Sequence, residues 1–162
     1  MAKTAASVAV RGVASVAYFA AAVSMLFAYQ RSYVNGFIFK ISFRDWVSFV
    51  LFAIANSLAS AYNFSTLCIP SGSNLWRMVV LVDMASTIVL VSSLSVSAES
   101  YHLLNNGSPK VDWSAVCGVA RHFCGVVLAA LALGACGLLL NLGLLFYSLL
   151  IIFNPHSFGD FI

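Results

Sequence analysis

Long stretches of apolar residues dominate the chain, and short polar segments separate them. A helix that crosses a bilayer needs roughly 20 mostly apolar residues. Four stretches meet this requirement, at about residues 5–29, 46–69, 78–98 and 115–150. Their apolar positions are continuous and do not alternate as in the strands of a membrane β-barrel. The pattern predicts an all-α integral membrane protein, a single domain (residues 1–162) built as a bundle of four transmembrane helices.

The last apolar stretch is much longer than one crossing requires. It extends over about residues 113–153, which as a helix would measure about 60 Å, twice the hydrocarbon thickness. Two crossings would need a turn inside it, but Gly134 and Gly137 have no proline or polar cluster beside them. We therefore predict one long fourth helix whose end at Arg121 projects from the membrane.

Composition excludes an ordinary water-soluble enzyme. The chain is 62% hydrophobic and only 8% charged, whereas soluble domains are about 45–50% apolar and about 25% charged. The basic residues lie near the ends of apolar stretches and not in one nucleic-acid-binding patch. Motifs for phosphate binding, serine hydrolysis or zinc proteolysis do not occur. We expect no enzymatic activity, no cofactor, no metal and no nucleic-acid partner.

Four crossings place both termini on the same side of the membrane. The first stretch is too long for a signal peptide and contains Arg11, so we expect it to be retained. With the N-terminus inside, three basic residues flank the inner surface and five the outer one, which opposes the positive-inside rule. The sequon at Asn106 would then face outside as a candidate glycosylation site, although Pro109 lowers its use.

Two opposite charges lie inside apolar stretches. Arg11 is about six residues into the first stretch, and Asp83 is about five residues into the third. These stretches run in the same direction, so the two charges lie at nearly the same depth. A charge at mid-bilayer costs at least about 2.5–3.5 kcal/mol. We predict an intramembrane ion pair that holds two helices in register; the alternative is part of an ion or proton path.

Small polar residues follow the same face of the third stretch. They lie at positions i+3, i+10 and i+14 from the aspartate: Ser86, Ser93 and Ser97. The second stretch contributes Asn56 and Tyr62. Such side chains form hydrogen bonds between closely packed helices. We interpret these residues as interhelical packing positions; the alternative is the lining of a water-filled pore.

Two of the four cysteines, Cys117 and Cys124, are seven residues apart, and no Cys-x-x-Cys motif occurs. On one continuous helix they would be about 10.5 Å apart along the axis, beyond the roughly 7 Å limit for a disulfide. A disulfide therefore requires the helix to begin after Cys117 or to break. A packing role inside an unbroken helix remains the alternative.

Several motifs occur in a fixed order along the chain. They are Arg11, Ala55-Asn56-Ser57 with Ala61-Tyr62, Asp83, a Leu-x-Asn-Asn-Gly turn, Trp113-x-x-Val116-Cys117 and Phe123-Cys124-Gly125. This combination, from about Arg11 to Leu150, resembles the plant Casparian strip membrane domain protein-like (CASP-like) family, which is related to MARVEL-type proteins. The segment 30–45 lacks the short signature of true Casparian-strip members, which favours a CASP-like relative.

The resemblance implies four spans with cytosolic termini, and it places the family's hallmark intramembrane arginine and aspartate at Arg11 and Asp83. It also implies a multi-pass plasma-membrane scaffold that self-associates into membrane domains and guides local cell-wall modification. The implied partners are membrane lipids, further copies or related proteins, and cell-wall enzymes. Two other functions stay open: a small channel or transporter subunit whose serine-rich third helix lines a pore, and an accessory subunit of a larger membrane complex.

Overall fold

The computed structural model describes residues 5–34, 37–68, 76–107 and 115–153. It contains four long helices, each apolar enough to cross a membrane: α1 (Ala5–Leu26), α2 (Val47–Leu67), α3 (Trp76–Asn106) and α4 (Arg121–Phe153). A two-stranded hairpin, β1 (Tyr29–Val34) and β2 (Phe37–Ser42), and a short 3-10 turn, η1 (Phe43–Asp45), connect α1 to α2. The predicted helical bundle with four spans is confirmed.

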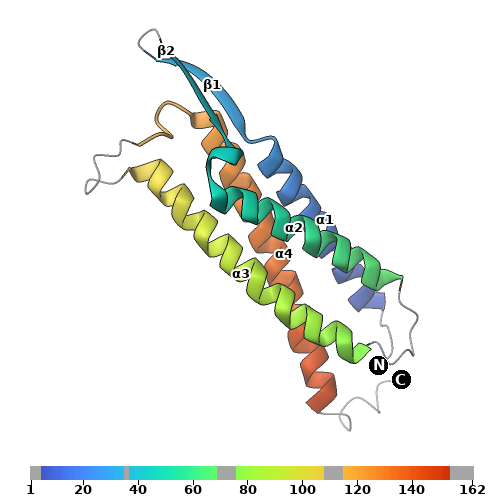
Figure 1. The fold of residues 1–162 in the computed structure, drawn as a ribbon. Helices are drawn as coiled ribbons and strands as arrows, with labels where there is room; N and C mark the ends of the chain where they lie inside the picture. Colours follow the sequence, from blue (N-terminus) through green and yellow to red (C-terminus); the bar gives the residue numbers. More distant parts are fainter. Residues whose placement is uncertain (1–4, 35–36, 69–75, 108–114, 154–162) are drawn as a thin grey trace.

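The helices form one elongated bundle (Figure 1). α1 contacts α2 and α4, and α3 contacts the same two helices from another side. The start of α1 and the end of α4 lie at one end of the bundle, which we call the terminal end. The hairpin stands at the opposite end, beyond the first turns of α2 and α4, and we call this the hairpin end.

Two helix boundaries differ from the sequence prediction. α4 begins at Arg121, later than the predicted start near residue 115, because the backbone of Val116 and Cys117 donates hydrogen bonds to the Leu104 carbonyl, at 2.9 and 3.1 Å. α3 continues past the apolar stretch to Asn106. It ends at Gly107, whose φ of 70° and N–H bond to the Leu103 carbonyl form a glycine cap.

The hairpin was not predicted from the sequence. Its strands are antiparallel, in a register that pairs Tyr29 with Ser42 and Val34 with Phe37. Asn-Gly separates the last two partners, and this dipeptide between apolar residues is the strongest short-range signal for a hairpin. The signal was therefore present in the sequence, although an all-helical prediction passed over it.

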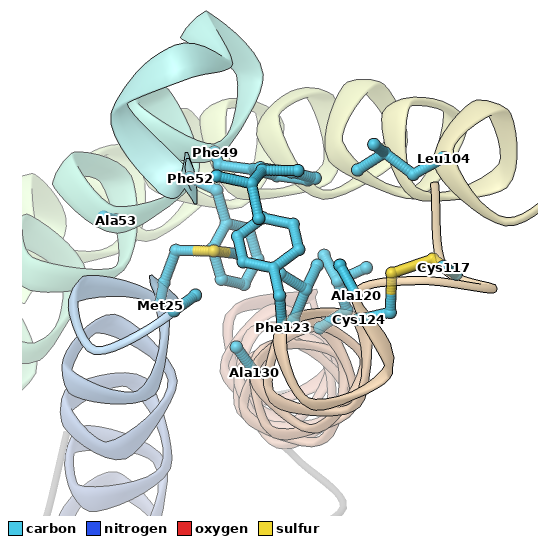
Figure 2. Packing of buried hydrophobic residues seen from close by; sticks show 14 of the residues in the cluster. Met25, Phe49, Phe52, Ala53, Leu104, Cys117, Ala120, Phe123, Cys124 and Ala130 are labelled. Carbon is cyan, nitrogen blue, oxygen red and sulfur yellow. A yellow bond between two sulfur atoms is a disulfide. The ribbon is translucent and has the colours of Figure 1, made fainter. Parts of the chain in front are cut away.

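The apolar core is concentrated toward the hairpin end (Figure 2). Phe49 from α2 and Phe123 from α4 meet edge to face, with ring centroids 6.3 Å apart. Phe52 and Met25 fill the space around them, and all four side chains are fully buried. This aromatic packing fixes α2 against α4.

Two glycines of α4 permit close approach of neighbouring helices. A β-carbon added at Gly137 would lie 2.8 Å from the ring of Tyr18 on α1. At Gly134 it would lie 2.7 Å from the ring of Phe52 on α2. Both distances are shorter than real contacts, so the absence of a side chain is what lets α4 pack here.

We expect Gly137→Ala to destabilise the bundle by about 1–3 kcal/mol, because the buried Tyr18 ring must move to admit the methyl group. Gly125→Ala on the same helix is the matched control, since a β-carbon there meets no atom within 4 Å. Thermal unfolding in detergent measures both. Equal melting temperatures for the two variants would contradict the predicted clash.

Candidate functional site

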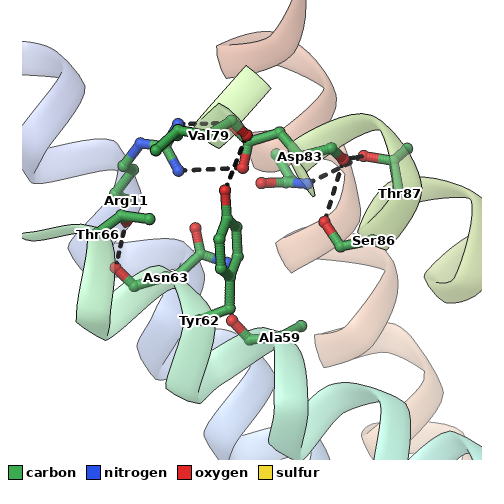
Figure 3. Close-up of polar contacts among 10 residues, drawn as sticks. Arg11, Ala59, Tyr62, Asn63, Thr66, Val79, Asp83, Ser86 and Thr87 are labelled. Carbon is green, nitrogen blue, oxygen red and sulfur yellow. Dashed lines mark hydrogen bonds and ion pairs between the residues drawn. The ribbon is translucent and has the colours of Figure 1, made fainter. Parts of the chain in front are cut away.

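Arg11 of α1 and Asp83 of α3 form an ion pair inside the bundle (Figure 3). Nη2 lies 2.5 Å from Oδ2, and Nη1 lies 3.3 Å from Oδ1. The two residues are only 4% and 1% exposed. A two-point contact between guanidinium and carboxylate is the strongest geometry that such a pair can take.

The fold explains why these two charges meet. Both residues lie near the start of their helices, and α1 and α3 run in the same direction from the terminal end. Their side chains therefore reach the same level of the bundle. Each charge removes the need for the other to be solvated, whereas either one alone would be an uncompensated charge in a water-poor interior.

Other polar groups extend the contact to the remaining two helices. Tyr62 of α2 donates its hydroxyl to the Val79 carbonyl of α3, at 2.9 Å. Thr87 donates to the Asp83 carbonyl at 2.7 Å, and Asn141 of α4 donates to the Thr87 hydroxyl at 3.1 Å. All four helices thus meet in one polar cluster, which we define as Arg11, Tyr62, Asp83, Thr87 and Asn141.

The other predicted packing residues behave differently from one another. Ser97 donates across to the Ser48 carbonyl of α2 at 2.9 Å, and Ser48 donates its own hydroxyl to Ser100 at 2.7 Å. Ser86 and Ser93 instead donate to carbonyls of their own helix, at 3.1 Å each. The interhelical bond that the sequence suggested for the serine stripe is thus observed at Ser97.

Asn56 likewise bonds within its own helix, donating to the Phe52 carbonyl at 2.8 Å. Its oxygen lies against α4, because a β-carbon at Gly134 would come within 3.4 Å of it. Asn56 therefore packs at the α2–α4 contact while its side-chain nitrogen is bonded inside α2.

Sequence reasoning missed Ser15, Thr87 and Asn141, three polar residues that join helices. Ser15 of α1 and Ser60 of α2 exchange hydrogen bonds with each other's carbonyls, both at 3.0 Å. Thr87 and Asn141 complete the polar cluster. Ser15 and Asn141 are isolated polar residues within apolar stretches, and Thr87 directly follows Ser86 of the serine stripe; these positions were the signal that could have identified them.

Cys117 and Cys124 form a disulfide (Figure 2), and it lies at the hairpin end because α4 begins there (Figure 1). Their Cα atoms are 5.7 Å apart, within the usual range for a disulfide. This geometry is available because α4 begins after Cys117, which is the alternative that the spacing left open. Both residues are buried beside Leu104, so the bridge ties the segment before α4 to the core.

The remaining predicted site lies at the same end. Asn106 is the last residue of α3 and is exposed, and its side-chain nitrogen donates to His102 Nε2 at 2.8 Å. The serine that completes its sequon lies outside the described residues. Across the described part of the chain, no three His, Cys, Asp or Glu side chains are grouped as metal ligands would be.

An apolar groove of about 370 Å³ lies between α2 and α3. It borders Ser93, but leucine, isoleucine, valine and alanine side chains make up most of its lining, among them Leu51, Ile54 and Val89. Such walls suit hydrocarbon better than water. The groove is therefore not a hydrophilic path along the serine stripe.

The sequence is similar to those of known plant proteins. Residues 1–140 match the family model of the Casparian strip membrane protein domain. CASP-like protein 1C2 of Populus trichocarpa is 31% identical over 149 residues, 92% of each chain. CASP-like protein 1C1 of Arabidopsis thaliana is 32% identical over 136 residues, 84% of this chain and 83% of its own length. No solved structure matches the chain.

The fold and its buried ionic contact define a multi-pass membrane protein with four helical spans. The chain belongs to the Casparian strip membrane protein domain family. The family match covers Arg11, Tyr62, Asp83 and Thr87 of the polar cluster and both cysteines of the disulfide, and Asn141 follows directly after it.

Proposed function

We propose that this protein is an oligomerising scaffold of the plasma membrane. In this role it forms membrane domains and organises partner proteins for local modification of the cell wall. Membership of the CASP-like family supports the proposal. The observation that supports it most directly is the polar cluster, because its charged and polar groups bond to other helices of the same bundle.

The polar cluster favours a scaffold over a transport path. A route for ions or protons needs ionisable groups that reach water along the membrane. Here Arg11 and Asp83 are buried and bonded to each other. A fixed contact of this kind holds the helices in register and gives the bundle one defined lipid-facing surface. That surface includes large exposed apolar residues on several helices, such as Phe19, Leu58 and Leu139, and these are available to lipids or further subunits.

The proposal places the hairpin end outside the cell and both termini in the cytosol. Disulfides persist in oxidising compartments and are rare in the cytosol, and the Cys117–Cys124 bridge lies at the hairpin end. The Lys/Arg count argues for the opposite orientation. We give the disulfide more weight, because a count of three against five is a small bias, whereas a reducing compartment would oppose the bridge.

We expect an epitope inserted between residues 34 and 37 to be labelled on intact cells. The same epitope at the N-terminus is the matched control, and it should be labelled only after permeabilisation. Antibody labelling with and without detergent measures both. Labelling of the N-terminal epitope alone on intact cells would contradict the proposed orientation.

The scaffold proposal is tested by measuring assembly directly. In nanodiscs of neutral lipid, native mass spectrometry should give integral multiples, greater than one, of the 17.3 kDa chain. In plant cells the fluorescently tagged protein should form confined domains with slow recovery after photobleaching. A larger partner at fixed stoichiometry would instead indicate an accessory subunit. Ion flux through liposomes containing the pure protein would indicate a channel. Either result would overturn the scaffold proposal.

A further inference from the structure

Exposed cations gather at the hairpin end, and we define them as the basic cluster: Arg31, Lys40, Arg44 and Arg121. Arg31 and Lys40 are direct partners across the hairpin register. In the part of the chain that the structure describes, the only ion pair is the one inside the bundle, between Arg11 and Asp83. The basic cluster therefore has no carboxylate partner among the described residues.

The hairpin is anchored to α4 at its base. The side-chain oxygen of Gln30 on β1 accepts a hydrogen bond from the backbone of Phe123 on α4, at 2.9 Å. This bond holds β1 against the first turn of α4, the helix that begins at Arg121. Side chains alternate along a strand, so Arg31 and its cross-strand partner Lys40 lie on the opposite face of the hairpin from Gln30.

Asp45 forms no ion pair with the basic cluster, although it follows Arg44 directly in η1. Its Oδ2 accepts hydrogen bonds from the backbone and hydroxyl of Ser42, at 2.8 and 3.2 Å. These bonds hold the carboxylate at the base of the hairpin, where its single charge offsets only part of the four positive charges. Arg44 instead lies over the ring of Phe43, 5.8 Å from the ring centroid.

The basic cluster is unfavourable for the protein alone. Like charges directly opposite each other destabilise a strand pair, and Arg31 and Lys40 are such a pair. Basic residues on the outer side of a membrane protein also oppose its orientation during insertion. A bound polyanion removes the first of these costs. We propose that the basic cluster is a docking surface for an acidic polysaccharide, a carboxylate-bearing polymer of the cell exterior.

The neighbours of the cations favour a sugar polymer over a lipid headgroup. The Arg31 guanidinium lies 5.5 Å from the ring centroid of Tyr29, which is 43% exposed. Phe43 beside Arg44 is half-buried against the core, so Tyr29 is the ring next to a cation that is open to a ligand. Uronic acid units have an apolar ring face and a carboxylate that complement such a ring and its cation. The hairpin also stands beyond the helix ends, where a polymer can reach it (Figure 1).

The inference rests on the proposed outward orientation, but the binding itself can be measured with the pure protein. The full chain in phosphatidylcholine nanodiscs is titrated with polygalacturonate, and with the same polymer after methyl esterification. We expect binding to polygalacturonate alone, and steep weakening as salt rises, because surface charges are screened. Arg31→Gln/Lys40→Gln should weaken binding at least about fivefold at low salt, since two exposed contacts are lost.

The matched control is Lys3→Gln/Arg77→Gln, which removes the same two charges elsewhere in the sequence and should leave the affinity unchanged. Unchanged melting temperatures show that both variants are folded. The inference is overturned if Arg31→Gln/Lys40→Gln binds like the wild type, or if the esterified polymer binds equally well. It is also overturned if only nanodiscs with anionic lipid bind.

The same samples separate this inference from the scaffold proposal. Oligomers that fail to bind polygalacturonate would overturn the docking surface and leave the scaffold intact. A monomer that binds polygalacturonate through Arg31 and Lys40 would overturn the scaffold proposal and leave the docking surface intact. The native mass and the binding isotherm therefore report on the two proposals independently.

Discussion

Asp83→Asn will destabilise the bundle by about 3–5 kcal/mol, because it leaves Arg11 as an uncompensated buried charge. Arg11→Gln will have a similar effect, because it leaves the buried Asp83 carboxylate without a partner. The double variant should recover part of the loss, because two neutral side chains of similar shape need no ionic partner. Thermal unfolding of each purified protein in mild detergent measures the effect, and size-exclusion chromatography shows whether it remains folded.

Glu99→Gln is the control for this prediction. It makes the same kind of change on the same helix, but Glu99 is exposed, so we expect a change within about 0.5 kcal/mol. If Asp83→Asn proved as mild as Glu99→Gln, the ion pair would not hold the bundle together. The scaffold proposal would then lose the observation that supports it most directly.

Loss of the disulfide is the second large effect. Cys117→Ser should reduce stability by about 2–5 kcal/mol, because it removes a crosslink and leaves a free Cys124 thiol in the core. Cys68→Ser is the control, since Cys68 is a free, exposed cysteine at the end of α2. Thermal unfolding with and without reductant measures the difference.

Reductant should lower the melting temperature of the wild type and of Cys68→Ser toward that of Cys117→Ser. It should leave Cys117→Ser itself unchanged, because that variant has no bridge to lose. If the wild type melted identically with and without reductant, the bridge would make no contribution to stability.

The four helices could be predicted from the sequence because hydropathy reports directly on burial in hydrocarbon. Their ends could not be predicted equally well. α3 continues through polar residues to Asn106, and only the glycine cap at Gly107 stops it. The start of α4 depends on hydrogen bonds to Leu104 from a segment that is apolar enough to resemble a helix. Apolar composition does not distinguish these two cases.

Some contacts of the candidate site could likewise be predicted from the sequence, and others could not. Arg11 and Asp83 could be placed together because equal depth on parallel helices needs only the direction and start of each span. Asn141 could not be placed against Thr87, because that contact depends on how α4 is rotated about its own axis. Two close contacts set this rotation, Gly137 against Tyr18 and Gly134 against Phe52. Such side-chain packing is not visible in a hydropathy pattern.

The bundle combines helices of two lengths. α1 and α2 have 22 and 21 residues, whereas α3 and α4 have 31 and 33. At 1.5 Å per residue the first pair measures about 32 Å and the second nearly 50 Å. The extra length of α3 comes from its polar last turns, which follow the apolar stretch and need no hydrocarbon around them, so its apolar part matches the shorter pair. α4 is apolar over most of its 33 residues, so it must tilt or extend past the surface of a bilayer that fits the other three helices.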